Sequence, residues 1–171
     1  GVRSPMFAYW PNKIQSGTTS NHISAFWDML PTFSELTSTP IEGETDGISM
    51  LPTLLGKPKH QKQHKYLYWE LYEWTPNCAV RHGPWKAVVL NRRKGLNVEL
   101  YNLKTDPGET IDVAMKHPKI VDEIVTMMKN AHVKNPFWDV ENKPLFDAGA
   151  AAKANGVEPD FSNSYYKPQK K

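Results

Sequence analysis

The sequence predicts an α+β fold in which a four-stranded antiparallel sheet packs on a C-terminal helix. Between Tyr66 and Tyr101, short runs rich in aromatic and β-branched residues alternate with tight turns, which is typical of antiparallel strands. From Pro118 to Val133, apolar residues recur at every third or fourth position, which is typical of an amphipathic helix. The apolar face of this helix is expected to cover one face of the sheet.

The expected strands share a composition that favours extended backbone, and they occupy residues 66–73, 79–81, 85–90 and 98–101. The turns between them contain Thr75-Pro76-Asn77, then Gly83-Pro84, then residues 92–95. Proline fixes φ near its turn value and glycine accepts positive φ, so these short segments reverse the chain. Consecutive strands joined by such turns are expected to pair antiparallel.

The N-terminal part of the chain predicts a strand followed by a helix. Residues 6–10 form an aromatic and apolar run closed by Pro11, which indicates a buried strand. A helix is expected to begin at Pro31, because proline is well tolerated at the first helical position. Residues 23–27 before it are expected to be extended or to form a single turn.

Two irregular segments follow that helix. Residues 47–56 are expected to contain one short helical turn, and residues 57–65 to form a charged and polar loop. His60 and His64 are four positions apart, as two metal ligands on one helix face would be, but the lysines and glutamines around them favour a solvated loop over a metal site. His22 is expected to be a hydrogen-bonded structural residue.

Composition bounds the function classes. At 171 residues the chain fits one domain, or one subdomain with a tail. Its 21 Lys and Arg exceed its 18 Asp and Glu by 3, and apart from residues 91–94 and the C-terminus they are scattered, so no nucleic-acid partner is expected. No apolar run of membrane-spanning length occurs, so no membrane partner is expected.

The chain contains one cysteine, Cys78, which excludes an internal disulfide framework and a cysteine-based zinc site. Cys78 lies in a strand run and is followed by Ala79, Val80 and Arg81. A lone cysteine in this setting is expected to be a small buried hydrophobe and not a nucleophile.

Three segments together resemble one enzyme family. Residues 99–110 read ELYNLKTDPGET, residues 46–56 read DGISMLPTLLG, and residues 1–5 read GVRSP. The first is similar to the ELYDL-x-x-DPGE string near the C-terminus of sulfatases of the arylsulfatase type, and the other two occur in that family's order and at about its spacing. A D-x-x-P-T element at Asp28–Thr32 also matches. The resemblance covers residues 1–133, most of the chain.

The resemblance implies a domain organisation. Residues 1–56 correspond to the end of an α/β sulfatase core, including its last strand and helix. Residues 57–134 correspond to the C-terminal antiparallel subdomain with its helix, and residues 135–171 to an extended C-terminal tail. The Gly-Val-Arg segment lies after the catalytic half of the family, so the chain resembles a sulfatase without its active-site core.

Sulfatases of this type use a formylglycine made from Cys or Ser in a C/S-x-P-S-R motif, together with a calcium ion. The sequence contains neither that motif nor paired aspartates, so no catalytic residue, metal ligand or cofactor is expected in this chain, and calcium and formylglycine are expected in the missing catalytic half. Asp28, Asp46 and Asp106 match family positions at which a carboxylate fixes a turn.

The loop that begins at Glu73 is the candidate substrate-binding site, because the resemblance implies that strand-connecting loops of this subdomain face the leaving group. Glu73 offers a hydroxyl acceptor, Trp74 a stacking face, and Arg81 and His82 are expected across the turn. The alternative interpretation is that all four are ordinary hairpin residues.

The functional prediction is therefore the C-terminal fragment of a sulfatase, a sulfuric ester hydrolase, that lends structural support and substrate-side loops but lacks the catalytic centre. The expected substrate of the intact enzyme is a sulfated small molecule or glycan. One alternative is a stand-alone binding or scaffold module. The other is a fragment of a phosphodiesterase, a phosphonate hydrolase or a phosphoglycerate mutase of the wider alkaline-phosphatase superfamily.

Two further expectations concern the setting of the protein. The family is mainly exported, so the resemblance implies a periplasmic, extracellular or cell-surface location. Residues 1–30 contain apolar side chains that a catalytic half would cover, so the isolated chain is expected to self-associate through this N-terminal segment.

Overall fold

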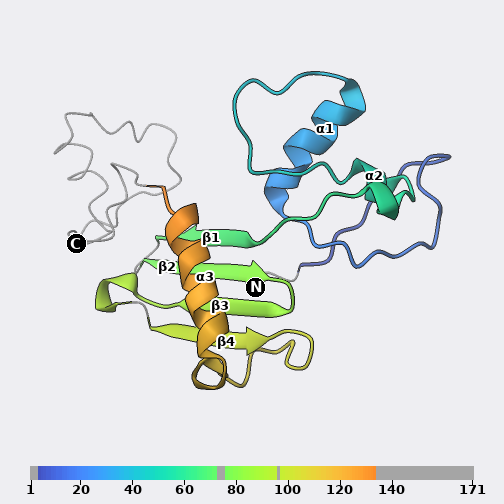
Figure 1. Ribbon diagram of the computed structural model, residues 1–171. Helices are drawn as coiled ribbons and strands as arrows, with labels where there is room; N and C mark the ends of the chain where they lie inside the picture. The colour runs from blue at the N-terminus through green and yellow to red at the C-terminus, as the bar shows by residue number, and fades with distance from the viewer. Residues whose placement is uncertain (1–3, 73–75, 96, 134–171) are drawn as a thin grey trace, which may run out of the picture. The chain divides into compact units, whose positions relative to one another are not determined.

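The computed structural model describes residues 4–72, 76–95 and 97–133. The chain divides into two compact units, Gly1–Lys65 and Tyr66–Lys171, and each is described by itself. Figure 1 shows the first unit in blue to teal and the described part of the second in green to orange. The predicted tail, residues 135–171, lies outside the described residues.

The second unit contains the predicted sheet. Its strands are β1 (Leu67–Leu71), β2 (Asn77–His82), β3 (Trp85–Val89) and β4 (Val98–Asn102). They lie in the order β1-β2-β3-β4, and every neighbouring pair is antiparallel. The β2–β3 turn is tight because Gly83 takes φ +55°, a backbone conformation that disfavours residues with a Cβ atom. The predicted α+β fold is confirmed.

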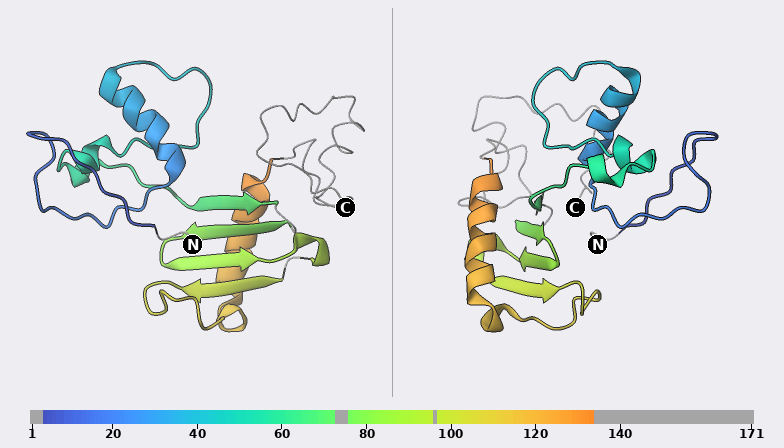
Figure 2. Two further views of the ribbon diagram at one scale, coloured as in Figure 1. Left: turned by 180° about the vertical axis from the view of Figure 1, so that it is seen from behind. Right: turned by 45° about the vertical axis from the view of Figure 1, so that its right-hand side comes forward.

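Helix α3 (Pro118–Ala131) crosses one face of this sheet, as Figures 1 and 2 show. Ile124 and Met128 on its apolar stripe are buried against strand side chains with no exposed surface, such as Val80 and Leu100. Burying side chains of this size contributes about 2–3 kcal/mol each. Pro118 is in the first turn of α3, as predicted, where its missing N–H is not needed.

A carboxylate fixes the turn that follows β4. Asp106 Oδ2 accepts hydrogen bonds from the backbone N–H groups of Thr110 at 2.8 Å and Ile111 at 2.9 Å. Chiefly because of the bond from Ile111, the pKa of Asp106 lies below its ordinary value. The predicted turn-fixing role of Asp106 is confirmed. The two hydrogen bonds to Asp106 fix the chain ahead of the short 3-10 turn Ala114–Lys116, which precedes α3.

The first unit is mainly irregular. A 3-10 turn at Phe26–Asp28 runs directly into α1 (Met29–Thr37), and α2 (Leu51–Leu54) and a 3-10 turn at Pro58–His60 follow. The prediction that a helix begins at Pro31 is wrong by two residues. Pro31 is the third residue of α1, where a helix N–H has no intrahelical partner, so proline costs no hydrogen bond there. The predicted short turn within residues 47–56 is confirmed as α2.

The predicted strand at residues 6–10 is not formed. This segment has no regular secondary structure, and it pairs with no strand of the described residues. A strand needs a neighbour for its backbone N–H and C=O groups, so local composition alone does not produce one. Among the described helices, none combines the length and the apolar character that a bilayer crossing requires.

Candidate functional site

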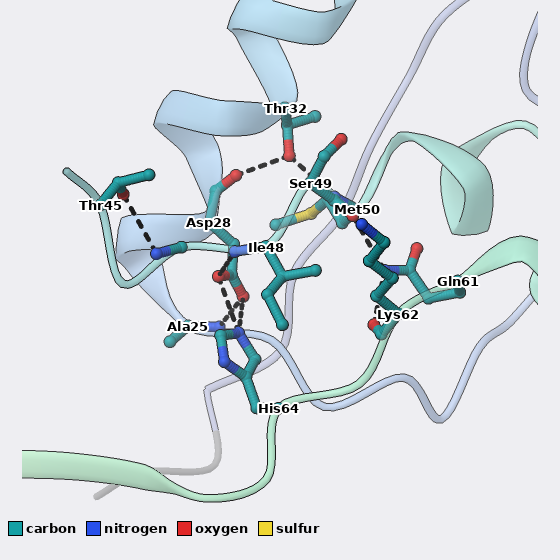
Figure 3. Close-up of polar contacts among 11 residues, drawn as sticks. Ala25, Asp28, Thr32, Thr45, Ile48, Ser49, Met50, Gln61, Lys62 and His64 are labelled. Atoms are coloured by element: carbon teal, nitrogen blue, oxygen red, sulfur yellow. Dashed lines mark hydrogen bonds and ion pairs between the residues drawn. The ribbon is translucent and has the colours of Figure 1, made fainter. Parts of the chain in front are cut away.

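A buried carboxylate, Asp28, organises the first unit (Figure 3). Its side chain has no exposed surface. Oδ2 accepts the N–H of Ala25 at 2.8 Å, and Oδ1 accepts the N–H of Ile48 at 2.8 Å. His64 Nε2 lies 2.8 Å from Oδ1 and 3.0 Å from Oδ2, so it donates to the carboxylate. Asp28 thus connects the start of α1 to two segments that are distant in the sequence, which extends its predicted turn-fixing role.

Two more buried polar side chains continue this network. Thr32 Oγ1 donates to the Asp28 carbonyl at 2.6 Å and accepts the Met50 N–H at 2.9 Å. Gln61 Oε1 accepts the N–H and the hydroxyl of Thr53 at 3.1 and 2.7 Å, and its Nε2 donates to the Ser49 carbonyl at 2.8 Å and to the Lys62 carbonyl at 3.0 Å. These bonds hold α2 (Leu51–Leu54) to the segment that follows it and hold Met50 to α1.

The prediction of a solvated loop over residues 57–65 is therefore wrong for two of its members. Gln61 is buried, and only 9% of the His64 side chain is exposed. Lys57, Lys59 and His60, which precede Gln61, are exposed, as predicted. The loop is polar for two reasons. Its buried side chains form hydrogen bonds with backbone N–H and C=O groups, and its lysines are exposed to water.

His22 is half-buried, and its backbone N–H donates to Ser20 Oγ at 3.1 Å. Burial lowers the pKa of the ring, and a side-chain hydrogen bond with Gln63 and the charge of Asp28 offset only part of that effect. Neither ring nitrogen meets strict hydrogen-bonding geometry, so the hydrogen-bonded structural role of His22 stays a prediction.

A second polar cluster surrounds Glu70 at the end of β1. Oε1 accepts bonds from the Tyr68 hydroxyl, from Arg92 Nη1 at 2.7 Å and from His132 Nδ1 at 2.6 Å, and Oε2 accepts the Tyr72 hydroxyl at 2.7 Å. Burial by itself raises the pKa of Glu70, but the bonds from the two tyrosines and His132 outweigh it and lower the pKa. Burial and Glu70 together raise the pKa of both tyrosine hydroxyls. The cluster ties the C-terminal end of α3 to β1.

The structure describes two of the four predicted site residues. Arg81 pairs with Leu67 of β1, and His82 Nε2 lies 3.5 Å from Glu123 Oε1 of α3. Glu73 and Trp74 lie outside the described residues. The grouping of these four residues in one substrate-binding site therefore stays a prediction.

Sequence reasoning missed one buried charge on the sheet. Lys86 is buried on the face opposite α3, where it is the cross-strand neighbour of Arg81 and forms an ion pair with Glu109. The signal was a lysine placed between Trp85 and Ala87 in an otherwise apolar strand. Such a lysine requires a carboxylate partner when it is buried.

The lone thiol is inert. Cys78 is buried, its Sγ lies 3.8 Å from Met128 Sδ, and burial raises its pKa to about 11. Only the thiolate is an effective nucleophile, so at neutral pH this residue does not act as one. The prediction of a small buried hydrophobe is confirmed. Within the described ranges, no three His, Cys, Asp or Glu side chains gather as a metal site built from them would require.

Comparison with known proteins gives a consistent result. Residues 1–135 match the family described as N-sulphoglucosamine sulphohydrolase, C-terminal. The ulvan-active sulfatase of Formosa agariphila is 38% identical over 156 residues, which cover 85% of this chain and 28% of that protein. The Δ4,5-hexuronate-2-O-sulfatase of Bacteroides thetaiotaomicron is 34% identical over 117 residues, which cover 60% of this chain and 24% of that protein.

A solved structure shares the fold. It is a complex with D-glucosamine-2-N,6-O-disulfate, described as its substrate, and it is similar with a TM-score of 0.59 and 23% identity over 71% of this chain and 26% of that one. This chain thus spans about a quarter of the length of these relatives. The match over residues 1–135, the order of the sequence motifs and the sheet-and-helix fold agree: the chain belongs to the sulfatase family, as a C-terminal sulfatase domain.

Proposed function

We propose that this chain supplies the C-terminal domain of a sulfatase that acts on a sulfated glycan, and that the catalytic centre lies in sulfatase sequence outside these 171 residues. In this proposal the chain supports the enzyme and contributes a substrate-side loop, with Glu73 and Trp74 as its contact residues. The formylglycine nucleophile and the calcium ion belong to the catalytic part, and the enzyme is exported to the periplasm or the cell surface.

Two observations together support the proposal: the chain matches the family, and its sequence lacks the nucleophile motif. The chain matches the C-terminal family over residues 1–135, yet no C/S-x-P-S-R string occurs anywhere in the sequence. Its one thiol is buried and protonated. A sulfuric ester hydrolase of this type needs an activated nucleophile, which this chain does not offer.

The names of the relatives support the substrate class. Two relatives more than 30% identical are named for ulvan and for a hexuronate, and a protein of the same fold is complexed with a sulfated glucosamine. The relatives named above are all carbohydrate-active, which favours a sulfatase for glycans over the phosphodiesterase alternative.

The test has two arms. The purified 171-residue chain is incubated with 4-nitrophenyl sulfate and calcium, and we expect no turnover above buffer. In the second arm, this chain replaces the matched C-terminal region of the ulvan-active sulfatase, and we expect the chimera to hydrolyse the substrate of its parent. Turnover by the chain alone that a chelator abolishes would overturn the proposal, as would a folded chimera without activity.

A further inference from the structure

The segment formed by residues 57–65 concentrates positive charge. It contains four lysines, spaced two or three positions apart, and no carboxylate, and the nearest acidic residues in the sequence are Asp46 and Glu70. Four of the 21 Lys and Arg lie here, so the other 17 meet 18 Asp and Glu and leave the rest of the chain at −1. The positive net charge of the chain therefore comes from this one segment.

The lysine side chains of the segment reach water. Lys57, Lys59 and Lys62 are exposed, and none of the three forms an ion pair with a carboxylate that the structure describes. Lys86 of β3 is the opposite case, because it is buried and paired with Glu109. A run of exposed lysines is most often only solvated, so charge by itself does not make a binding surface.

The backbone that carries these lysines is fixed, which a merely solvated loop does not require. The N–H of Lys57 donates to the Pro52 carbonyl at 2.8 Å. On either side of Lys62, the side chains of Gln61 and His64 turn toward the buried network of the first unit and form the hydrogen bonds described above (Figure 3). Binding costs less conformational entropy when the backbone is already ordered. The exposed ammonium groups therefore extend from a pre-organised main chain.

We infer that Lys57, Lys59 and Lys62, which we call the lysine surface, bind the sulfate groups of a sulfated polysaccharide, an inference that rests on the proposed function. The occupant is argued from charge complementarity, since ammonium groups form charge-assisted hydrogen bonds with the oxygens of an oxyanion. A polymer with repeated sulfates can engage several lysines at once, which a single sulfate ester cannot. Such a surface also raises the rate at which a polyanion is captured.

A nucleic acid is the other common polyanion, and the segment is less suited to it. Residues 57–65 contain no Arg for bidentate base contacts and no Phe, Tyr or Trp on which bases stack. The comparison of the two polymers is therefore part of the test.

The experiment measures binding of the full 171-residue chain to ulvan, to chemically desulfated ulvan and to a DNA duplex by isothermal titration calorimetry. The variant Lys57→Gln/Lys59→Gln/Lys62→Gln removes the lysine surface. The matched control, Lys104→Gln/Lys116→Gln/Lys119→Gln, removes three exposed lysines of the second unit. Both variants lower the net charge from +3 to 0, so a difference between them reports the position of the charge and not its amount.

We expect the natural chain to bind ulvan, and the lysine-surface variant to bind it at least about tenfold more weakly, while the control changes by less than about twofold. Desulfation and high ionic strength should both weaken binding, since exposed charges are screened by salt. The substituted side chains are exposed, so all three chains should have the same melting temperature, which is measured in parallel. Absence of binding by the natural chain would overturn the inference. So would equal binding by the two variants, binding that survives desulfation, or equally tight binding of DNA.

The result is separable from that of the proposed function, because this binding requires no catalytic centre. Ulvan binding that depends on the lysine surface, together with an inactive chimera, counts against the proposed function alone. An active chimera whose KM for ulvan is the same with the lysine-surface variant as with the control counts against the lysine surface alone.

Discussion

The two units of the chain distribute polar and apolar side chains in opposite ways. The second unit buries an apolar cluster between its sheet and α3, including Val80, Leu100 and Ile124. Among its described residues, the first unit buries three polar side chains, Asp28, Thr32 and Gln61, and two large hydrophobes, Met50 and Leu51. Its apolar side chains on α1 face outward instead.

This difference indicates which unit can be stable by itself. Apolar burial is the dominant favourable contribution to folding, whereas a hydrogen bond contributes only about 1 kcal/mol net. The second unit has its own core. The first unit is shaped mainly by hydrogen bonds among its buried polar side chains.

The largest expected effect tests the core of the second unit. Met128→Asp places a carboxylate where the native side chain is 3% exposed, and we expect a loss of about 4 kcal/mol in the free energy of unfolding. Asn130→Asp, on the exposed side of the same helix, should cost less than about 1 kcal/mol. Urea unfolding followed by circular dichroism measures both. An unchanged midpoint for Met128→Asp would mean that α3 does not cover the sheet.

The second unit could be predicted from sequence because its signals are local. The period-2 runs, the Gly83-Pro84 turn and the apolar stripe of 118–131 each specify an element without reference to distant residues. Only the packing of α3 on the sheet is a tertiary contact, and it could be inferred from the apolar stripe of the helix.

The first unit could not be predicted in the same way, because its contacts are long-range and polar. Asp28 bonds to residues 20 and 36 positions away, Ile48 and His64, and no periodic pattern marks such pairs. His64 was assigned to a solvated loop because its neighbours in sequence are lysines and glutamines. The prediction of a strand at residues 6–10 is wrong for a related reason, because a strand needs a neighbouring strand to pair with its backbone N–H and C=O groups.

For the candidate substrate site, the structure describes only Arg81 and His82. The antiparallel register puts Arg81 opposite Leu67 of β1. Whether these two residues join Glu73 and Trp74 in one site depends on residues 73–75, which lie outside the described residues, so the site stays a prediction.

The next prediction tests whether hydrogen bonds hold the first unit. Asp28→Ala removes the acceptor for Ala25, Ile48 and His64 in a fully buried place, and we expect a loss of about 3 kcal/mol. The matched control is Glu44→Ala, an exposed carboxylate of the same unit, for which we expect a change within about 0.5 kcal/mol.

Hydrogen exchange read separately for the two units shows where the loss occurs. Faster exchange confined to residues 25–64 supports the comparison, because the second unit has an independent core. Faster exchange spread equally over the sheet would instead mean that the two units unfold together. No change in either unit would show that the Asp28 network contributes nothing.

The smallest expected effect concerns the Glu70 cluster, a polar network in the second unit. Glu70→Gln keeps the shape of the side chain but removes the charge that accepts bonds from Tyr68, Tyr72 and His132, and we expect a loss of about 1 kcal/mol at pH 5.5. Glu99→Gln, which alters a carboxylate bonded to the Tyr101 hydroxyl, is the control and should cost less than about 0.5 kcal/mol.

The pKa of Glu70 predicts how the effect of Glu70→Gln on the free energy of unfolding changes with pH. The pKa of Glu70 is lower in the folded protein than the value of about 4.3 expected in the unfolded chain. A depressed carboxylate pKa adds stability above the unfolded value and loses it as the pH falls through the folded value. The difference in unfolding free energy between the natural chain and Glu70→Gln should therefore be full at pH 5.5 and smaller at pH 3.5. A difference that stays constant between these two pH values would show that the cluster acts through packing and not through the charge of Glu70. In that case the two units would differ only in how their cores bury apolar side chains.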